Sequence, residues 1–214
     1  YVITSASHGL SGKDSVRIAN GSYTIVSGKD GIHSQNKDDS SSGFVNLAGG
    51  TYTISAGDDG IHAASNVTIS DGKIDIAQSY EGIEGLSIDI AGGEISVLAS
   101  DDGINAAGGN DNSSSEGFQG GDDQFASTED AYIQISSGVL HVNASGDGID
   151  SNGDITVSGG ETYVSGPTND GNGSLDYNGS AQITGGIFAA SGSSGMAQNF
   201  DSSSTQGTIM VNID

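Results

Sequence analysis

The sequence predicts an all-β protein built as a parallel β-helix, a solenoid in which short strands stack in register from one coil to the next. A glycine-centred motif recurs along the whole chain with a period of about 22 residues, and alternating polar and apolar residues flank each copy. A repeat of this length is too small to bury a core alone, so neighbouring copies must pack on one another. A propeller would need a longer period of about 40 residues, and the sequence lacks the leucine ladder of leucine-rich repeats.

The recurring motif joins an acidic residue to glycine and isoleucine. Its clear copies are Lys29-Asp30-Gly31-Ile32-His33, Asp58-Asp59-Gly60-Ile61-His62, Tyr80-Glu81-Gly82-Ile83-Glu84, Asp101-Asp102-Gly103-Ile104-Asn105 and Gly146-Asp147-Gly148-Ile149-Asp150. Weaker copies are Ser7-His8-Gly9-Leu10, Thr168-Asn169-Asp170-Gly171 and Ser194-Gly195-Met196. These copies together predict about eight coils.

Residues 49–72 show the elements of one repeat in order. Residues 51–56 alternate polar and apolar side chains, which is typical of a half-buried strand. The segment Asp58-Asp59-Gly60 predicts a turn, Ile61 returns to the interior, and residues 66–70 alternate again. No segment carries the periodicity of a helix over about 11 residues or more. We therefore expect three strands in each coil, each of roughly three to five residues, with ladders of Ile and Val between them.

Two segments interrupt the repeat and predict loop insertions. Residues 35–43 are polar, and residues 108–130 are rich in Gly, Ser, Asp and Glu, with Phe118 and Phe125 as their only large apolar side chains. Long loops on a regular scaffold often carry function. Because the repeat otherwise runs from end to end, we expect residues 1–214 to form a single domain.

The charge of the chain is strongly negative. Asp and Glu number 28 against 5 Lys and Arg, which gives a formal net charge of −23, and cysteine is absent. Nucleic acid is excluded as a partner because phosphate binding needs a basic face. No apolar run is long enough for a membrane span, and no signal peptide is visible, so we expect a trimmed mature fragment. Disulfides do not hold this fold.

The acidic residues of the motif should form columns, because equivalent positions of successive coils lie above one another. The first column would contain Asp30, Asp59, Glu81, Asp102, Asp147 and Asp170. The second, three positions later, would contain His33, His62, Glu84, Asn105 and Asp150, and the third, one position before the first, Asp58 and Asp101. At a strand spacing of about 4.8 Å, two carboxylates repel each other by about 1 kcal/mol in water and by several times more inside a protein.

Two explanations of these columns remain open. Asp favours tight turns, where its side chain accepts hydrogen bonds from backbone N–H groups. Alternatively the columns bind Ca²⁺, which takes oxygen ligands from flexible carboxylates. Two clusters of candidate calcium ligands are Asp58, Asp59, Glu81 and Glu84, and then Asp101, Asp102, Asn105, Asp147 and Asp150, with Asp30 and Asp170 as further column members. A zinc site at His33 and His62 is a weaker alternative because it lacks a third ligand.

Several segments resemble a family of clostridial extracellular proteins that bind cellulose and polygalacturonate. The resemblance runs from about Gly49 to Gln198, and the matching segments are Ser79-Tyr80-Glu81-Gly82-Ile83-Glu84-Gly85, residues 101–109 and 165–173, Ser174-Leu175-Asp176-Tyr177 and Gly192-Ser193-Ser194-Gly195-Met196-Ala197-Gln198. The resemblance implies a right-handed parallel β-helix similar in fold to family 9 polysaccharide lyases. It also implies several calcium ions held by the acidic columns, an extracellular or cell-surface location and glycan binding. It assigns no residue to sugar contact.

The leading functional hypothesis is a monomeric, non-catalytic carbohydrate-binding module for plant cell-wall polysaccharide. Acidic pectin (polygalacturonate) is the preferred ligand and cellulose the second candidate, because column-bound calcium can bridge protein and uronate carboxylates. Tyr80, Tyr163, Tyr177 and Phe125 are candidates for stacking on sugars or for ordinary packing. One alternative is a calcium-dependent polysaccharide lyase, for which Lys29 is the best-placed base. The other is a structural stalk or adhesin without glycan specificity.

Overall fold

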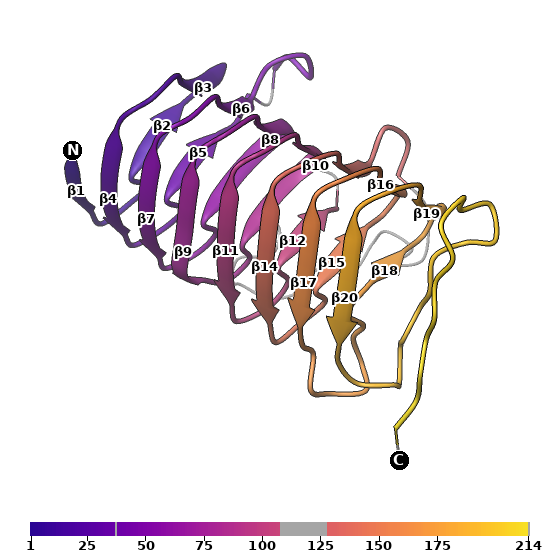
Figure 1. Cartoon of the computed structure of the whole chain (residues 1–214). Coiled ribbons are helices and arrows are strands. Elements are labelled where there is room, and N and C mark those ends of the chain that lie inside the picture. The colour runs from indigo at the N-terminus through magenta and orange to yellow at the C-terminus, as the bar shows by residue number, and fades with distance from the viewer. Residues whose placement is uncertain (37, 108–127, 214) are drawn as a thin grey trace.

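The computed structural model describes residues 1–36, 38–107 and 128–213. Within these ranges the chain consists of β-strands joined by turns and loops, without a helix. The strands lie side by side in two layers, and the N-terminus and C-terminus lie at opposite ends of the row of strands (Figure 1).

One layer is an 8-stranded parallel sheet, which faces the viewer in Figure 1. Its strands, in spatial order, are β1 (Val2–Ser5), β4 (Ser22–Ser27), β7 (Thr51–Ala56), β9 (Lys73–Ser79), β11 (Glu94–Ala99), β14 (Val139–Ala144), β17 (Glu161–Ser165) and β20 (Ile187–Ser191). Every neighbouring pair in this order is parallel, so each strand pairs with the equivalent strand of the next repeat.

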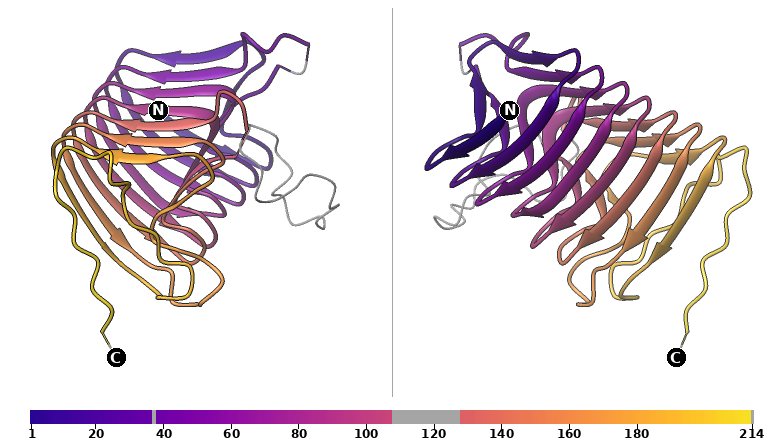
Figure 2. Two further views of the ribbon diagram at one scale, coloured as in Figure 1. Left: turned by 90° about the vertical axis from the view of Figure 1, so that its right-hand side faces the viewer. Right: turned by 60° about the vertical axis from the view of Figure 1, so that its left-hand side comes forward.

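The second layer is a 12-stranded parallel sheet. Its members are β2 (Leu10–Gly12), β3 (Ser15–Ile18), β5 (Ile32–Ser34), β6 (Phe44–Leu47), β8 (Ile61–Ile69), β10 (Ile83–Ile90), β12 (Ile104–Ala106), β13 (Tyr132–Ile135), β15 (Ile149–Ser151), β16 (Asp154–Val157), β18 (Asp176–Tyr177) and β19 (Ala181–Ile183). The two layers are seen from other sides in Figure 2.

The core lies between the layers and is built from period-2 strands. In β7, Tyr52, Ile54 and Ala56 are buried, whereas Thr51 and Thr53 are exposed. The register places isoleucine on isoleucine across neighbouring repeats, as in the pairs Ile25↔Ile54 and Ile54↔Ile76. Burial of one such side chain contributes about 1.5–3 kcal/mol, and the same position repeats along the sheet. The repeated apolar positions therefore hold the layers together.

The prediction of a right-handed parallel β-helix, a solenoid of about eight coils with three short strands in each, is wrong. The strands instead form two large parallel sheets of 8 and 12 strands. The physical reason lies in β8 and β10, which run through nine and eight residues without a break. Each pairs with two strand sets at once, because the N-terminal half of β8 pairs with β5 and its C-terminal half pairs with β6. Two of the three expected strand sets thus merge into one sheet.

Of the two expected loop insertions, the first lies almost wholly within the described residues and most of the second lies outside them. Residues 35, 36 and 38–43 contain no strand and connect β5 to β6, as the polar composition of this segment predicts. Most of the segment 108–130 lies outside the described residues, including Phe118 and Phe125. Residues 128–130 belong to the turn and loop before β13.

The turns that carry the motif glycines pack directly against one another. A Cβ atom on Gly103 would lie 2.5 Å from the carbonyl oxygen of Gly148, the equivalent glycine of the next repeat. Real Cβ atoms do not approach oxygen that closely, so glycine is required here by space. Because the glycines of successive repeats lie against one another, the residues that directly precede them are aligned along the turns.

Candidate functional site

The residues before the motif glycines form a row along the turns, which we name the turn row. Each following glycine donates its N–H to the carbonyl oxygen of the equivalent residue in the next repeat, at 2.8–2.9 Å. The members, in order, are His8, Asp30, Asp59, Glu81, Asp102 and Asp147. Gly148 then donates to Gly173, so the row ends at Gly173 and not at Asp170.

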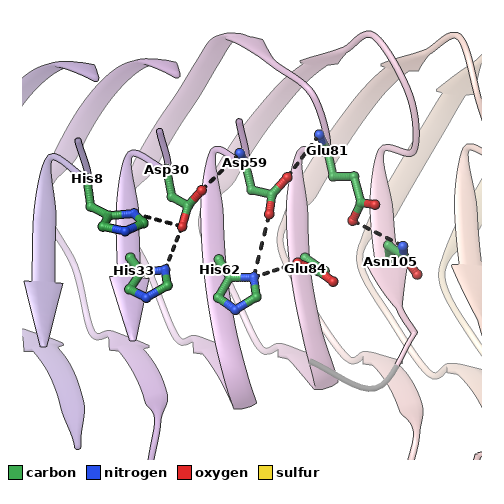
Figure 3. Close-up of polar contacts among 8 residues, drawn as sticks. All are labelled: His8, Asp30, His33, Asp59, His62, Glu81, Glu84 and Asn105. Atoms are coloured by element: carbon green, nitrogen blue, oxygen red, sulfur yellow. Dashed lines mark hydrogen bonds and ion pairs between the residues drawn. The ribbon is translucent and has the colours of Figure 1, made fainter. Parts of the chain in front are cut away.

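A second row lies three residues later, on the short strands of the 12-stranded sheet, and we name it the strand row. The register of β5, β8, β10, β12, β15 and β18 aligns its members directly. They are His33, His62, Glu84, Asn105, Asp150 and Asp176. The two rows run beside each other, and Figure 3 shows their side chains from His8 to Asn105.

Backbone capping accounts for part of the acidic pattern. Asp30 Oδ1 accepts a hydrogen bond from the N–H of Asp59 at 3.4 Å, and Asp59 Oδ1 accepts one from Glu81 at 3.2 Å. Asp102 Oδ1 accepts one from Asp147 at 2.6 Å. Asp147 continues the pattern with Gly173 at 2.5 Å. Each carboxylate thus ties one turn to the next, which is the turn-forming role that Asp commonly takes.

At the N-terminal end, histidines surround the carboxylate of Asp30. Its Oδ2 atom lies 2.5 Å from His33 Nδ1 and 3.0 Å from His8 Nδ1. Burial alone would raise the pKa of Asp30, but the hydrogen bond and charge of His33 lower it overall. The pKa of His8 is lowered, mainly by burial and by the neighbouring His33. Asp30 is therefore ionised and already paired with nitrogen donors.

The middle of the two rows holds a buried triad of Asp59, His62 and Glu84. His62 Nδ1 lies 2.5 Å from Glu84 Oε2 and 3.5 Å from Asp59 Oδ2, and the His62 side chain is wholly inaccessible. Burial opposes a charged imidazole, but the hydrogen bonds to Asp59 and Glu84 prevail and raise the pKa of His62 to about 10. The triad therefore contains its own cation.

Glu81, a member of the first predicted calcium cluster, contacts a residue of the next repeat. Its Oε2 atom accepts a hydrogen bond from Asn105 Nδ2 at 3.1 Å. Burial and the nearby carboxylates of Glu84 and Asp59 raise the pKa of Glu81 well above its usual value. The structure therefore does not gather Asp58, Asp59, Glu81 and Glu84 as one group. Asp58 instead lies close to Asp30 and Asp59.

Further towards the C-terminal end of the two rows, three carboxylates gather; backbone N–H groups bind two of them, but in the described part of the chain no cationic side chain pairs with them. One oxygen each of Asp102, Asp147 and Asp150 lies within 4.8 Å of the others, and all three side chains are half-buried. None of the ion pairs found in the described part of the chain includes any of the three. We name these residues the carboxylate cluster.

Burial and mutual repulsion disfavour ionisation of the carboxylate cluster. Burial, with the charges of Asp147 and Asp176, raises the pKa of Asp150 to about 8. Burial also raises the pKa of Asp147 to about 6, against the hydrogen bond from Gly173. The pKa of Asp102 is raised well above its usual value by burial and then by Asp150 and Asp147. A cation placed among the three would remove this cost.

The remaining predicted ligands lie outside the carboxylate cluster. The carboxylate of Asp101 is hydrogen-bonded to the Tyr80 hydroxyl, which raises the pKa of Tyr80. Asn105 shares a register position with Asp150. Asp170 is exposed and accepts a hydrogen bond from Ser193 Oγ.

Two members of the rows were not predicted as site residues, His8 and Asp176. His8 directly precedes Gly9, as Asp30 precedes Gly31, so the weak copy Ser7-His8-Gly9-Leu10 held the signal. Asp176 follows Gly173-Ser174-Leu175, which matches Asp147-Gly148-Ile149 before Asp150. The sequence pattern favours Asp170-Gly171 as the motif of this repeat, because this dipeptide resembles Asp-Gly more closely than Gly173-Ser174 does. The equivalence of Asp176 and Asp150 is therefore not apparent from the motif.

The sequence model of a family described as carbohydrate-binding domain-containing protein matches residues 1–131. The chain belongs to this family. No curated protein and no solved structure matches the chain. Membership supports a carbohydrate-binding role with a polysaccharide as partner, which is the coarser part of the functional prediction. The matched segment contains the turn row from His8 to Asp102.

Within residues 1–36, 38–107 and 128–213, no helix has the length and apolar character needed to cross a membrane.

Proposed function

We propose that this protein is a non-catalytic, extracellular module that binds acidic plant cell-wall polysaccharide, polygalacturonate, through calcium held at the carboxylate cluster. The observation that carries the proposal is the convergence of Asp102, Asp147 and Asp150 within 4.8 Å without a neutralising side chain. Family membership supports carbohydrate as the class of ligand. A cation held by the cluster would allow a chain with a net charge of −23 to bind a polyanion.

The donor set of the cluster fits a hard cation. Ca²⁺ takes six to eight oxygen ligands at about 2.4 Å, from carboxylates, carbonyls and water. Three carboxylates supply only part of that number, so positions remain for uronate oxygens and water. The side-chain oxygen of Asn105 is buried without a hydrogen-bond partner and lies in the row beside Asp150. It offers a further neutral oxygen at this position.

The contrast between the two ends of the rows favours this position over the rest of the acidic pattern. Asp30 faces two histidines, and Asp59 and Glu84 share the proton of His62. Calcium at those positions would meet nitrogen atoms already in contact with the carboxylates, whereas Ca²⁺ prefers oxygen ligands. At the carboxylate cluster it would instead relieve repulsion.

The placement of Lys29 weighs against the lyase alternative. Lys29 directly precedes Asp30, and three repeat steps separate it from the equivalent residue Asp101. At about 4.8 Å for each step, this places Lys29 about 14 Å from the cluster along the rows. A general base must lie within hydrogen-bonding distance of the proton that it removes, so Lys29 does not serve uronate bound at the cluster.

Affinity electrophoresis through polygalacturonate, with calcium and then with a chelator, tests the proposal. The variant is the double substitution Asp102→Asn and Asp150→Asn, which keeps the size of both side chains and an oxygen that accepts the bond from Asp147. The matched control is Asp75→Asn, since Asp75 is exposed on β9 in the other sheet. We expect calcium-dependent retardation of the wild type and the control, and its loss in the double variant.

Retardation by the double variant equal to that of the wild type would overturn the calcium bridge. Retention that survives the chelator would move the glycan site away from the cluster. Binding to cellulose in place of polygalacturonate would keep the carbohydrate-binding role and reject the acidic ligand.

A further inference from the structure

Three imidazole rings form a stack at the N-terminal end of the two rows, which we name the histidine stack: His8, His33 and His62. The ring centroids of His8 and His33 lie 3.9 Å apart with an interplanar angle of 21°. Those of His33 and His62 lie 5.1 Å apart at 13°. The rings are nearly parallel; the Nδ1 atoms of His8 and His33 face Asp30, and that of His62 faces Glu84 and Asp59 (Figure 3).

The first two rings converge on one oxygen atom. Asp30 Oδ2 lies 3.0 Å from His8 Nδ1 and 2.5 Å from His33 Nδ1, and the three donor atoms lie within 4.8 Å of one another. His8 Nδ1 is buried, yet it has no hydrogen-bond partner of good geometry. A nitrogen that is buried close to a carboxylate without a well-formed hydrogen bond leaves a polar atom unsatisfied, and such atoms call for an explanation.

We propose that His8, His33 and Asp30 form a binding site for a divalent transition-metal ion of the zinc type. Imidazole nitrogen and carboxylate oxygen together are the ligand set that zinc takes in proteins, with Zn–N distances of about 2.0–2.1 Å. Two ligands at that distance in tetrahedral geometry are separated by about 3.3 Å. The His8–Asp30 separation is already close to this value, and His33 has to withdraw from Asp30 by less than about 1 Å.

This site is chemically and spatially separate from the carboxylate cluster. Two nitrogen donors select a borderline-soft ion, whereas Ca²⁺ prefers oxygen donors. Asp30 and Asp102 are three steps apart in the turn row, about 14 Å at the strand spacing. The inference therefore stands without the proposed calcium bridge. His62 lies at the closed side of the site, because its Nδ1 atom faces Glu84 and Asp59.

The exposure of the site allows an ion to enter. The His8 side chain is 21% exposed and lies outside the strands, between β1 and β2. Asp30 and His33 behind it are almost fully buried. Three protein ligands with one accessible side leave a coordination position for water, as in zinc sites that are not purely structural.

Isothermal titration of the metal-free full chain with Zn²⁺ alone, in the presence of excess Ca²⁺, tests the site. The principal variant is His8→Ala, which removes a ligand from a loop without removing a core side chain. The control is His141→Ala, because His141 is an exposed histidine on β14 of the other sheet. A change in a residue that merely supports a metal ligand already weakens metal affinity by about 10- to 100-fold. We therefore expect His8→Ala to weaken zinc binding at least about tenfold, and His141→Ala to leave it unchanged.

A second readout uses absorption in place of the heat of binding. Co²⁺ in place of Zn²⁺ should give a visible absorption band in the wild type and the His141→Ala protein, and no band in His8→Ala. Circular dichroism should show the same strand content in all three proteins. Wild-type affinity in His8→Ala, displacement of zinc by calcium or the lack of any zinc binding by the wild type would each overturn the site.

Discussion

Substitution of Asp150 by Asn should stabilise the calcium-free protein and destabilise the calcium-loaded one. The two side chains have the same shape, so the change removes a charge with little effect on packing. Asp150 lies in the carboxylate cluster, where its oxygen is within 4.8 Å of those of Asp102 and Asp147. The substitution therefore removes two repulsive pairs and one potential cation ligand.

The size of the effect follows from Coulomb's law. At 4.8 Å, one pair of carboxylates repels by about 1 kcal/mol in water and by about 3 kcal/mol at an effective dielectric constant of 20. Two pairs give about 2–7 kcal/mol, and the half-buried position of the cluster places the expected gain near the lower figure. About 2 kcal/mol corresponds to a rise in Tm of about 4–8 °C for a chain of this length.

The gain should depend on pH in a defined direction. Burial and the neighbouring charges raise the pKa of Asp150 to about 8, above its ordinary value of 3.8. The folded protein then binds the proton more tightly than the unfolded chain, so the stability that this residue contributes is complete below pH 3.8 and is lost as the pH rises through 8. Asp150→Asn should therefore match the wild type near about pH 4 and exceed it most near about pH 9.

Thermal unfolding followed by circular dichroism, in metal-free buffer and in millimolar calcium, measures all of these effects. Asp75→Asn is the control and should change Tm by less than about 1 °C, as surface substitutions usually do. A lower Tm of Asp150→Asn in metal-free buffer at high pH, or a gain that does not change with pH, would refute the repulsion argument. An equal response of Asp150→Asn and wild type to calcium would refute the cation site.

Three further predictions concern the interior. His62→Gln leaves two buried carboxylates without their cation, so urea unfolding should show a loss of about 3–5 kcal/mol in the free energy of unfolding. Because the pKa of His62 is raised to about 10, this loss should be complete below about pH 6.5 and shrink as the pH rises through 10. A loss that grows with pH would contradict the pairing. Ile83→Ala should cost about 2–5 kcal/mol in the same assay, since Ile83 is fully buried, and a cost below about 1 kcal/mol would contradict the tight packing. Gly103→Ala should lower Tm because the added Cβ atom would clash with the next turn. Gly207→Ala should leave Tm unchanged, because a Cβ atom there would have no atom within 4 Å. Equal effects of the two substitutions on Tm would contradict the close approach of the turns.

The strands could be predicted from the sequence, but the way in which they join into sheets could not. Alternation over residues 51–56 predicts a strand, and β7 occupies those residues. The continuity of β8 depends on residues 63–66, where no alternation marks a strand and where the neighbouring strands β5 and β6 supply the pairing. Propensity is local, whereas a merged sheet is a property of three repeats together. The predicted β-helix failed at this point.

The rows of the site were partly predictable for a similar reason. The shared Asp-Gly-Ile motif aligns Asp102 with Asp147 across the insertion of residues 108–130, and the strand register agrees. The hydrogen-bond partner of each side chain was not predictable, because it depends on the rotamers of neighbouring side chains. Glu84 contacts His62, whereas Glu81 contacts Asn105. Asp170 was placed in the row on its Asp-Gly dipeptide, whereas the backbone pairs Gly148 with Gly173.

The nearest-neighbour pairing of the strands has a consequence for the ancestry of the molecule. A strand such as β9 contacts β7 and β11 within its sheet, and the same is true along the whole 8-stranded layer. Duplication or loss of one complete repeat in the gene would therefore preserve every interface except the one at the junction. Such an event would also add or remove one position in the turn row and in the strand row. Unequal recombination between repeats can thus lengthen or shorten both rows without a new fold.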